Sequence, residues 1–443
     1  MDIMTAGMSY CPEKKCLRII VHLTKVPRRN SFMRFPLRLS PIRLLLFSTT
    51  LLIQMISAFP TIGLPLLRHQ VPMSYTHIGL LFSVGALASM VLEPLVNVLS
   101  DLTSSKKYWV IGAMFVLVGA FLMAGLAHSF TVLLISFALL YPAHDIAEGV
   151  VQTALVDDNP HKSTRTLTRL AYFGNSGDFL APVTVAIIAF LALGWSTLCI
   201  LAVAIWLCVA FVTLFHHFPK VADHEQREQK SRVLAGLRLV QHNPILFCWV
   251  VMAIFPIFLD EVFRSFAGLY LQDMLHMSDD QVEVLLSIET GAGFAGLLLT
   301  EILLWLRVPK HWMLLYSAII VFFSMLSLLF THQLWAMVVE LCLTGACSIA
   351  WFPLARAQVY DRLPGYSGAG RALLSLGAPV NVILPSVVGF IAGAYGIVAG
   401  VGFLMLAPIG IFVLVVSGLA REHRPQVVQE VLSETLSATQ SSV

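Results

Sequence analysis

Residues 219–243 read PKVADHEQREQKSRVLAGLRLVQHN and form the longest polar, charged connector inside an otherwise apolar sequence. Long apolar stretches separated by short polar turns lie on both sides of it, six before and six after. A helix needs roughly 20 predominantly apolar residues to cross a bilayer. The connector therefore divides the sequence into two halves, each with six expected membrane-spanning helices.

The composition excludes a water-soluble protein. Of the 443 residues, 58% are hydrophobic and 12% are charged, and the mean hydropathy is +0.82. An average soluble domain carries about 25% charged residues. We expect an all-α, polytopic membrane protein of twelve spans. They fall near residues 42–66, 77–100, 107–127, 130–156, 167–193, 196–218, 244–270, 281–305, 311–330, 333–357, 371–394 and 396–420.

The basic residues indicate how the chain crosses the membrane. All of the 28 Lys and Arg residues except Arg68 and Arg264 lie on one side of the expected spans. Because Lys and Arg near span ends resist translocation, this side is cytoplasmic and carries both termini. We expect a multi-pass protein of the cell (inner) membrane. Its expected parts are a basic tail (1–40), a six-helix bundle (41–218), a cytoplasmic linker (219–243), a second six-helix bundle (244–420) and a C-terminal tail (421–443).

The first 40 residues leave two interpretations open. Their basic side chains suit contact with anionic lipid. They also fit an upstream extension, because Met33 offers a second start for a complete protein.

The two halves resemble each other when the second is shifted by 203 residues. One offset aligns uncommon residue types at equivalent places in the two halves, which chance matches between apolar sequences do not explain. A parallel repeat of six spans places a binding site between the halves near mid-membrane. The aligned pairs are Lys107 and Lys310, Trp109 and Trp312, Val156 and Val359, Asp158 and Asp361, Gly174 and Gly377, Asp178 and Asn381, and Pro182 and Pro385.

Twelve spans, a six-plus-six duplication and a polar central loop resemble the major facilitator superfamily over about residues 41–420. The family's motif G-x-x-x-D-R-x-G-R-K between the second and third spans is present in reduced form. Asp101 and Lys106 match it, whereas Asn97 replaces its first Gly. The resemblance implies that Asp101 and Lys106 belong to a gating loop. The motif by itself also fits a helix end followed by a basic turn.

The fourth and fifth spans are similar to motifs of the drug/proton antiporter branch of that family. Gly149 matches the last residue of R-x-x-Q-G, but Asp145 and Glu148 stand at its Arg and Gln positions. Gly174, Gly177 and Pro182 resemble a shortened Gly/Pro-rich antiporter motif. The resemblance implies proton antiport, although the charge at the fourth-span motif is reversed.

The fourth span carries a polar stripe. Tyr141, Asp145, Glu148 and Gln152 are separated by four, three and four residues, which places them on one helical face. Two poorly solvated carboxylates one turn apart repel each other, so one of them readily takes up a proton. Asp145 and Glu148 are therefore candidates for proton coupling, and Tyr141 and Gln152 for the cavity lining. His144 either joins this relay or packs against a neighbouring helix.

The fifth span adds a second polar patch. Asp178 is a further proton-coupling candidate, and Asn175 precedes it by about one turn. Asn381 occupies the duplicated position in the eleventh span, so only one half keeps the charge at this place. Asn175 and Asn381 are cavity candidates. Alternatively, Gly174, Gly177 and Pro182 shape helix packing, and Asp178 bonds to a neighbouring helix.

The seventh span contains the one deep basic residue. Arg264 follows Asp260 by four residues and Glu261 by three, so either acid could pair with it. The ion pair is either structural or a switch in which Arg264 binds an anionic substrate group in one state. All three residues are cavity candidates. Glu289 in the eighth span has no evident partner in the sequence and is the fourth proton-coupling candidate.

These features predict a secondary transporter that moves a small molecule by alternating access, with proton antiport and efflux as the favoured mode. Proton-coupled uptake of a small metabolite and metal-cation transport through His144 and Glu148 stay open. An intramembrane enzyme is a remote alternative, because the segment from His144 to Glu148 lacks the second His of H-E-x-x-H chemistry. We therefore expect no catalytic residues.

The expected partners follow from this function. They are a small-molecule substrate, protons and the lipid bilayer. The sequence has no phosphate-binding loop of the G-x-x-x-x-G-K-[ST] type, so coupling to ATP hydrolysis within the chain is not supported. We expect no cofactor, no resident metal ion, no nucleic-acid partner and a monomeric protein.

Overall fold

The computed structural model describes residues 41–102, 106–157, 163–215, 244–362 and 373–422. Every regular element in this part of the chain is helical, and twelve segments are long and apolar enough to cross a membrane. The expected tail 1–40, the linker 219–243 and residues 423–443 lie outside the described residues. The side chains of the gating-loop candidates Asp101 and Lys106 also lie outside them.

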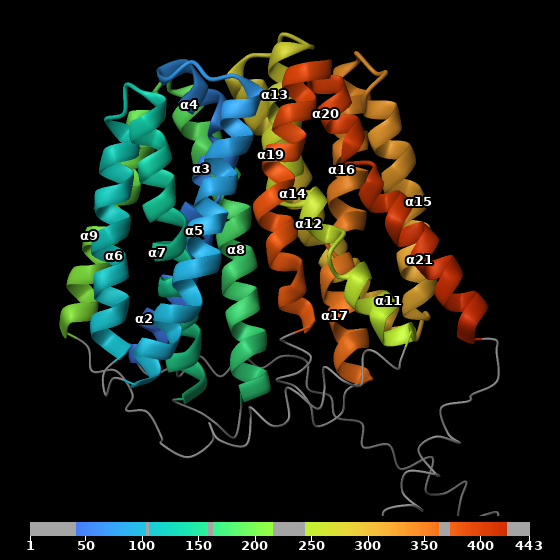
Figure 1. Ribbon diagram of the computed structural model, residues 1–443, viewed down its shortest axis with the longest axis horizontal. Helices are drawn as coiled ribbons and strands as arrows, with labels where there is room; N and C mark the ends of the chain where they lie inside the picture. The colour runs from blue at the N-terminus through green and yellow to red at the C-terminus, as the bar shows by residue number, and fades with distance from the viewer. Residues whose placement is uncertain (1–40, 103–105, 158–162, 216–243, 363–372, 423–443) are drawn as a thin grey trace, which may run out of the picture. The chain divides into compact units, whose positions relative to one another are not determined.

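The first half, in the order of the chain, contains the helices that form spans one to six. They are α2 (Pro41–Ser57), α3 (Phe59–Ile62), α4 (Leu64–Gln70), α5 (Tyr75–Leu102), α6 (Lys106–Gly125), α7 (Phe130–Asp157), α8 (Ser163–Phe190) and α9 (Trp195–Phe215). Figure 1 shows α2 beginning at the lower end of this bundle and α4 lying at the upper end.

The second half contains spans seven to twelve. They comprise α11 (Pro244–Met252), α12 (Pro256–Leu259), α13 (Glu261–Asp273), α14 (Asp279–Trp305), α15 (Lys310–Leu328), α16 (Leu334–Ser348), α17 (Trp351–Asp361), η2 (Ser375–Gly377), α19 (Ala378–Tyr395), α20 (Ile397–Phe403) and α21 (Leu406–Glu422). The end of the bundle where α2 begins and α21 ends is called the terminal end below (Figure 1). The opposite end, which carries α4 and the end of α13, is called the far end.

The seventh span is broken, although the sequence predicts one continuous helix over 244–270. The span extends over Ile245–Asp273 but is divided into α11, α12 and α13. Pro256 opens α12 and cannot continue the hydrogen bonding of the preceding helix. Asp260 interrupts the chain again, with a non-helical ψ of −114°. Irregular backbone at membrane depth is tolerated where it is buried in protein or lines a cavity, so this break marks the seventh span as a site-forming element.

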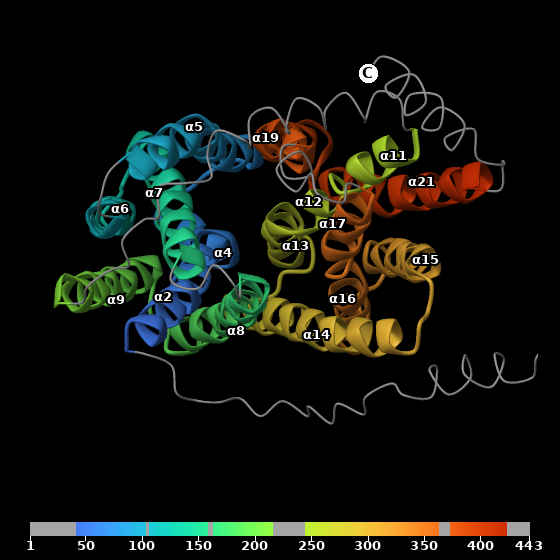
Figure 2. The same cartoon turned by 90° about the horizontal axis from the view of Figure 1, so that it is seen from below.

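The two halves pack against each other along two edges. Helix α5 lies beside α19 at one edge, and α8 lies beside α14 at the other (Figure 2). Between these edges, α13 packs against α3 and α4 of the first span. The polar stripe of α7 and the broken seventh span thus both belong to the region enclosed by these contacts.

The α5–α19 edge depends on small residues. A Cβ atom added to Gly79 would lie 2.3 Å from the backbone oxygen of Pro385, and one added to Gly389 would lie 2.5 Å from that of Tyr75. Beside this crossing, the Ser386 hydroxyl donates to the Ser83 hydroxyl at 2.8 Å. Small residues let helix backbones approach and replace lipid contacts by protein contacts.

The close crossing of α5 and α19 predicts that one added methyl group lowers the stability of the protein. Gly79→Ala should lower the thermal unfolding temperature of the purified protein, because the backbones must separate, and overpacking costs about 1–3 kcal/mol. Gly112→Ala is the matched control, since no atom lies within 4 Å of its added Cβ and helical Ala is favoured over Gly by about 0.5–1 kcal/mol. Equal unfolding temperatures for the two variants would contradict the close crossing.

Candidate functional site

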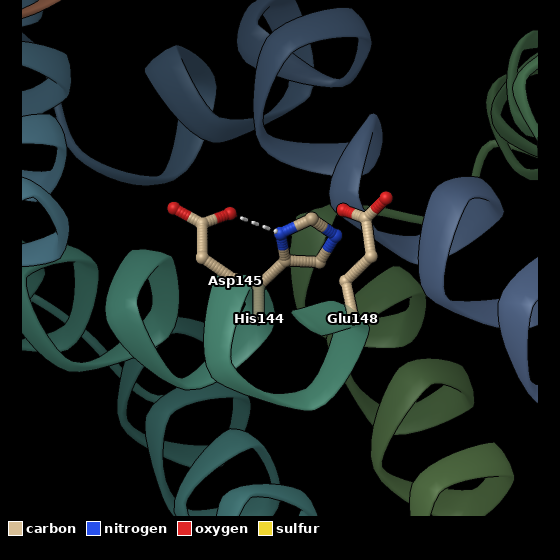
Figure 3. Close-up of side chains that lie close together, drawn as sticks. All are labelled: His144, Asp145 and Glu148. Carbon is tan, nitrogen blue, oxygen red and sulfur yellow. Dashed lines mark hydrogen bonds and ion pairs between the residues drawn. The ribbon is translucent and has the colours of Figure 1, made fainter. Parts of the chain in front are cut away.

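The α7 stripe forms a cluster of hydrogen-bonded acids. His144 Nδ1 lies 2.9 Å from Asp145 Oδ1, and Ser89 of α5 donates to the other oxygen of Asp145. Glu148 Oε1 accepts a hydrogen bond from Gln54 Nε2 of α2 at 3.1 Å. Figure 3 shows the His144 ring between the two carboxylates. These donors from two other helices support charge on α7 at membrane depth.

His144 is the least satisfied member of this cluster. Its side chain is mostly buried, and its Nε2 atom has no hydrogen-bond partner in the described part of the chain. One ligand atom from each of His144, Asp145 and Glu148 can be chosen so that all three lie within 4.8 Å of one another. The expected alternative, a His that merely packs, leaves this unpartnered nitrogen unexplained.

A second cluster surrounds Arg264 in the seventh span. The Arg264 Nε atom donates to Glu289 Oε2 of α14 at 3.1 Å, and its Nη1 donates to Asp260 Oδ1 at 3.3 Å. The side chain of Glu289 is 3% exposed, whereas that of Asp260 is 66% exposed. Arg264 thus provides the partner of Glu289 that the sequence does not reveal, and it bonds Asp260 rather than Glu261.

The two clusters approach each other across the halves. Asp178 of α8 lies within electrostatic range of Arg264 and Asp260 on one side and of Glu148 on the other. Glu261 lies within range of Asp145. The acids on α7 and α8 and those on the seventh span therefore share one electrostatic environment near mid-membrane.

A small cavity lies at this junction. Its volume is ≈10 Å³, enough for about one water molecule. Among its lining residues are the candidates Tyr141, Glu261 and Asn381, together with Phe82 and Phe266. Gln152 and Asn175, also expected in the cavity, make no hydrogen bond to either cluster among the described residues.

A cluster of polar side chains joins the two halves at the far end, which no sequence motif indicated. Arg68 of α4 forms an ion pair with Asp273 of α13, and the Tyr75 hydroxyl donates to the same carboxylate. His69 Nε2 lies 3.0 Å from Asp279 Oδ2 at the start of α14. We call these five residues the far-end latch. Arg68, His69 and Asp273 border a surface depression of ≈560 Å³. The latch closes the first span against the seventh and eighth.

The family model described as Major Facilitator Superfamily matches residues 46–377. The chain belongs to the Major Facilitator Superfamily. Its fold and its twelve spans are those of this transporter superfamily, as the sequence predicts. No protein of curated function matches the sequence.

Solved transporter structures share the Major Facilitator fold of this chain. A bacterial homolog of the human lysosomal transporter Spinster, inward-facing and unoccupied, has 14% identity and a TM-score of 0.70, with 86% of this chain and 98% of that chain covered. The nucleoside transporter NupG has 14% identity and a TM-score of 0.70, with 87% and 100% covered. FucP in the outward conformation has 19% identity and a TM-score of 0.57, with 85% and 98% covered. Identities this low show the fold alone.

The Arg264 cluster of this Major Facilitator chain predicts that Arg264 and Glu289 contribute to the free energy of unfolding in a strongly coupled way. Arg264→Met should destabilise the protein by about 3–5 kcal/mol, because it leaves Glu289 buried without its cation. Adding Glu289→Gln should recover much of this loss, which a double-mutant cycle of unfolding measurements would detect. Asp260→Asn is the control and should cost less than about 1 kcal/mol, since the Asp260 side chain is exposed and Arg264 keeps its bond to Glu289. Additive effects of the first two substitutions would contradict the pairing.

Proposed function

We propose that this Major Facilitator chain is a proton-coupled secondary transporter that exports a small organic molecule across the cell membrane by alternating access. The observation that carries the proposal is the meeting of acids from both halves near mid-membrane, with Glu148 and Asp178 on one side and Asp260 on the other. Ionised groups at this depth carry a high free-energy cost, and they commonly mark ion or substrate pathways.

The excess of acid over base supports a cationic or amphiphilic substrate. Arg264 is the basic residue of the central region, and it is already bonded to two carboxylates. A positively charged substrate and protons would compete for the remaining carboxylates. Such competition is the simplest basis for antiport, because the release of one species accompanies the binding of the other. The aromatic side chains of Phe82 and Tyr141 add apolar and cation–π surface at the cavity.

The conformation agrees with the inward-facing state of an alternating-access cycle. The distribution of Lys and Arg in the sequence supports a cytoplasmic position for the terminal end, in which case the far-end latch closes the path to the outside. The TM-score is 0.70 with the inward-facing Spinster homolog and 0.57 with the outward-facing FucP. This difference supports an inward-facing conformation of the present chain. We assign Asp145, Glu148 and Asp178 to proton coupling. Arg264 and Glu289 form the fixed pair against which these groups act.

Proteoliposomes with an acidic lumen test the proposed coupling, with tetraphenylphosphonium as the probe. Asp145→Asn, Glu148→Gln and Asp178→Asn should each reduce gradient-driven uptake by about tenfold or more, because each removes a group that exchanges protons. Glu301→Gln is the control, since Glu301 accepts a hydrogen bond from Tyr172 at 3.2 Å and is exposed. Parental uptake rates in all three test variants would refute the assigned coupling residues. No uptake by the parent would reject a lipophilic-cation substrate.

Metal-cation export is a second candidate, which the grouping of His144, Asp145 and Glu148 favours. In that case the metal is cargo, and the Asp145 carboxylate orients the ring so that the free Nε2 of His144 can ligate it. Zn²⁺ uptake into vesicles that contain a trapped fluorescent indicator would then be proton-driven and lost in His144→Asn. Gradient-driven uptake of tetraphenylphosphonium but not of Zn²⁺ by the parent would exclude this alternative.

A further inference from the structure

Glu283 is a buried acid that the clusters described above do not include. It lies on α14, four residues and so about one helical turn after Asp279 of the far-end latch. Its relative exposure is 0%, and neither carboxyl oxygen has a hydrogen-bond partner in the described part of the chain. Every other acid considered for coupling has a bonded donor or some exposure. Glu283 has neither.

No cation among the described residues bonds the Glu283 carboxyl. Helix α14 packs against α8, α13 and α16. Several of the described charged side chains on those helices are engaged elsewhere. Asp178 lies in the field of Arg264, Arg264 bonds Glu289 and Asp260, Asp273 bonds Arg68, and Glu340 accepts hydrogen bonds from Ser327 and Thr331.

The charge that acts on Glu283 has the same sign as its own ionised form. That charge belongs to Asp279, which itself contacts His69 and Gln272. An isolated ionised carboxylate without donors costs several kcal/mol to bury, and the group takes up a proton instead. Burial without a donor therefore favours the neutral form of the Glu283 carboxyl in this conformation.

The position of Glu283 links this proton to the far-end latch. Asp279 is both a member of the latch and the charged neighbour that acts on Glu283. Separation of the first span from the start of α14 would admit water beside Glu283. This water would lower the free-energy cost of ionising the Glu283 carboxyl. We propose that Glu283 is a second proton-binding site, occupied while the far-end latch is closed and emptied to the far side when the latch opens. This proposal rests on the proposed alternating access, but it does not depend on the α7 and α8 carboxylates or on the substrate.

The direction of the pH effect follows from this difference in occupancy. A ligand shifts a conformational equilibrium toward the state that binds it more tightly. Because the closed state binds the Glu283 proton, acid on the far side favours closure, and rising pH favours opening. One linked proton changes the opening equilibrium by at most about tenfold per pH unit.

Two measurements on the full chain in lipid bilayers test the site. Infrared difference spectra of the parent at neutral pH should contain the carbonyl band of a protonated carboxylic acid, and Glu283→Gln should remove it. The second measurement follows latch opening as the reactivity of Leu67→Cys, introduced without the native cysteines, because Leu67 is fully buried on α4. Its labelling should rise with far-side pH in the parent background and become independent of pH with Glu283→Gln.

Glu340→Gln is the matched control, because Glu340 is a buried acid of the same half whose carboxylate has hydroxyl donors. It should keep the pH dependence of labelling. If Glu283→Gln does not fold, Asp279→Asn provides a second test. Removal of its like charge should make proton loss from Glu283 easier, so that the infrared band disappears at lower pH than in the parent.

An unchanged infrared band or unchanged pH-dependent labelling in Glu283→Gln would overturn the site, as would an unshifted band in Asp279→Asn. Neither readout requires a substrate. Failure of gradient-driven uptake in the parent would therefore reject the proposed export and leave the Glu283 result standing, and the two failures can be told apart.

Discussion

The cost of placing charge in a low-dielectric membrane interior constrains this whole structure. Arg264 is 14% exposed and lies in the middle of the seventh span, so it must be paired. Glu289 from the neighbouring helix and Asp260 from the helix break supply that pairing. The break at Asp260 is what brings a carboxylate and an irregular backbone to this depth. The remaining acids also need donors, which Ser89 and Gln54 of the first half supply to Asp145 and Glu148.

The contacts between the halves differ greatly in strength. The α5–α19 edge is formed by backbones in direct contact at Gly79 and Gly389, a packing that any added atom disturbs. The latch consists of polar contacts at the rim, in which the His69 side chain is 65% exposed and those of Arg68 and Asp273 are each 26% exposed. Exposed ion pairs contribute about 0–1 kcal/mol each. A rearrangement that breaks the latch and keeps the edges is therefore much less costly than the reverse, which favours rocking about the edges.

The sequence predicts the fold well because the membrane imposes a strong and local pattern. Apolar length and the placement of Lys and Arg suffice for the twelve spans, and helical periodicity suffices to place Asp145 and Glu148 on one face. The pairing of Glu148 with Gln54 could not be predicted, since the residues are 94 positions apart and on different helices. Local spacing likewise suggested two acids for Arg264. One of them, Asp260, pairs with it, but Glu289 replaces Glu261 as the second.

The breaks in the seventh span and the far-end latch show two further limits of prediction from the sequence. Pro256 is a sequence signal for the division of the seventh span. Assigning 244–270 by apolar length alone does not take this residue into account. The latch had no signal, because Arg68, Asp273 and Asp279 each look like ordinary residues at the end of a span. Glu283 likewise resembles an interfacial acid in sequence, and its complete burial becomes apparent only when the neighbouring helices are assembled.

The buried acids fall into two kinds that differ in their hydrogen-bond donors. Asp145, Glu148 and Glu289 each accept a hydrogen bond from a side chain on another helix. Neither carboxyl oxygen of Glu283 has a hydrogen-bond partner in the described part of the chain, so water that reaches it would be its first donor. A rocking motion that wets the far end would convert conformational change into proton release at this residue, while the central acids remain available to substrate and proton alike.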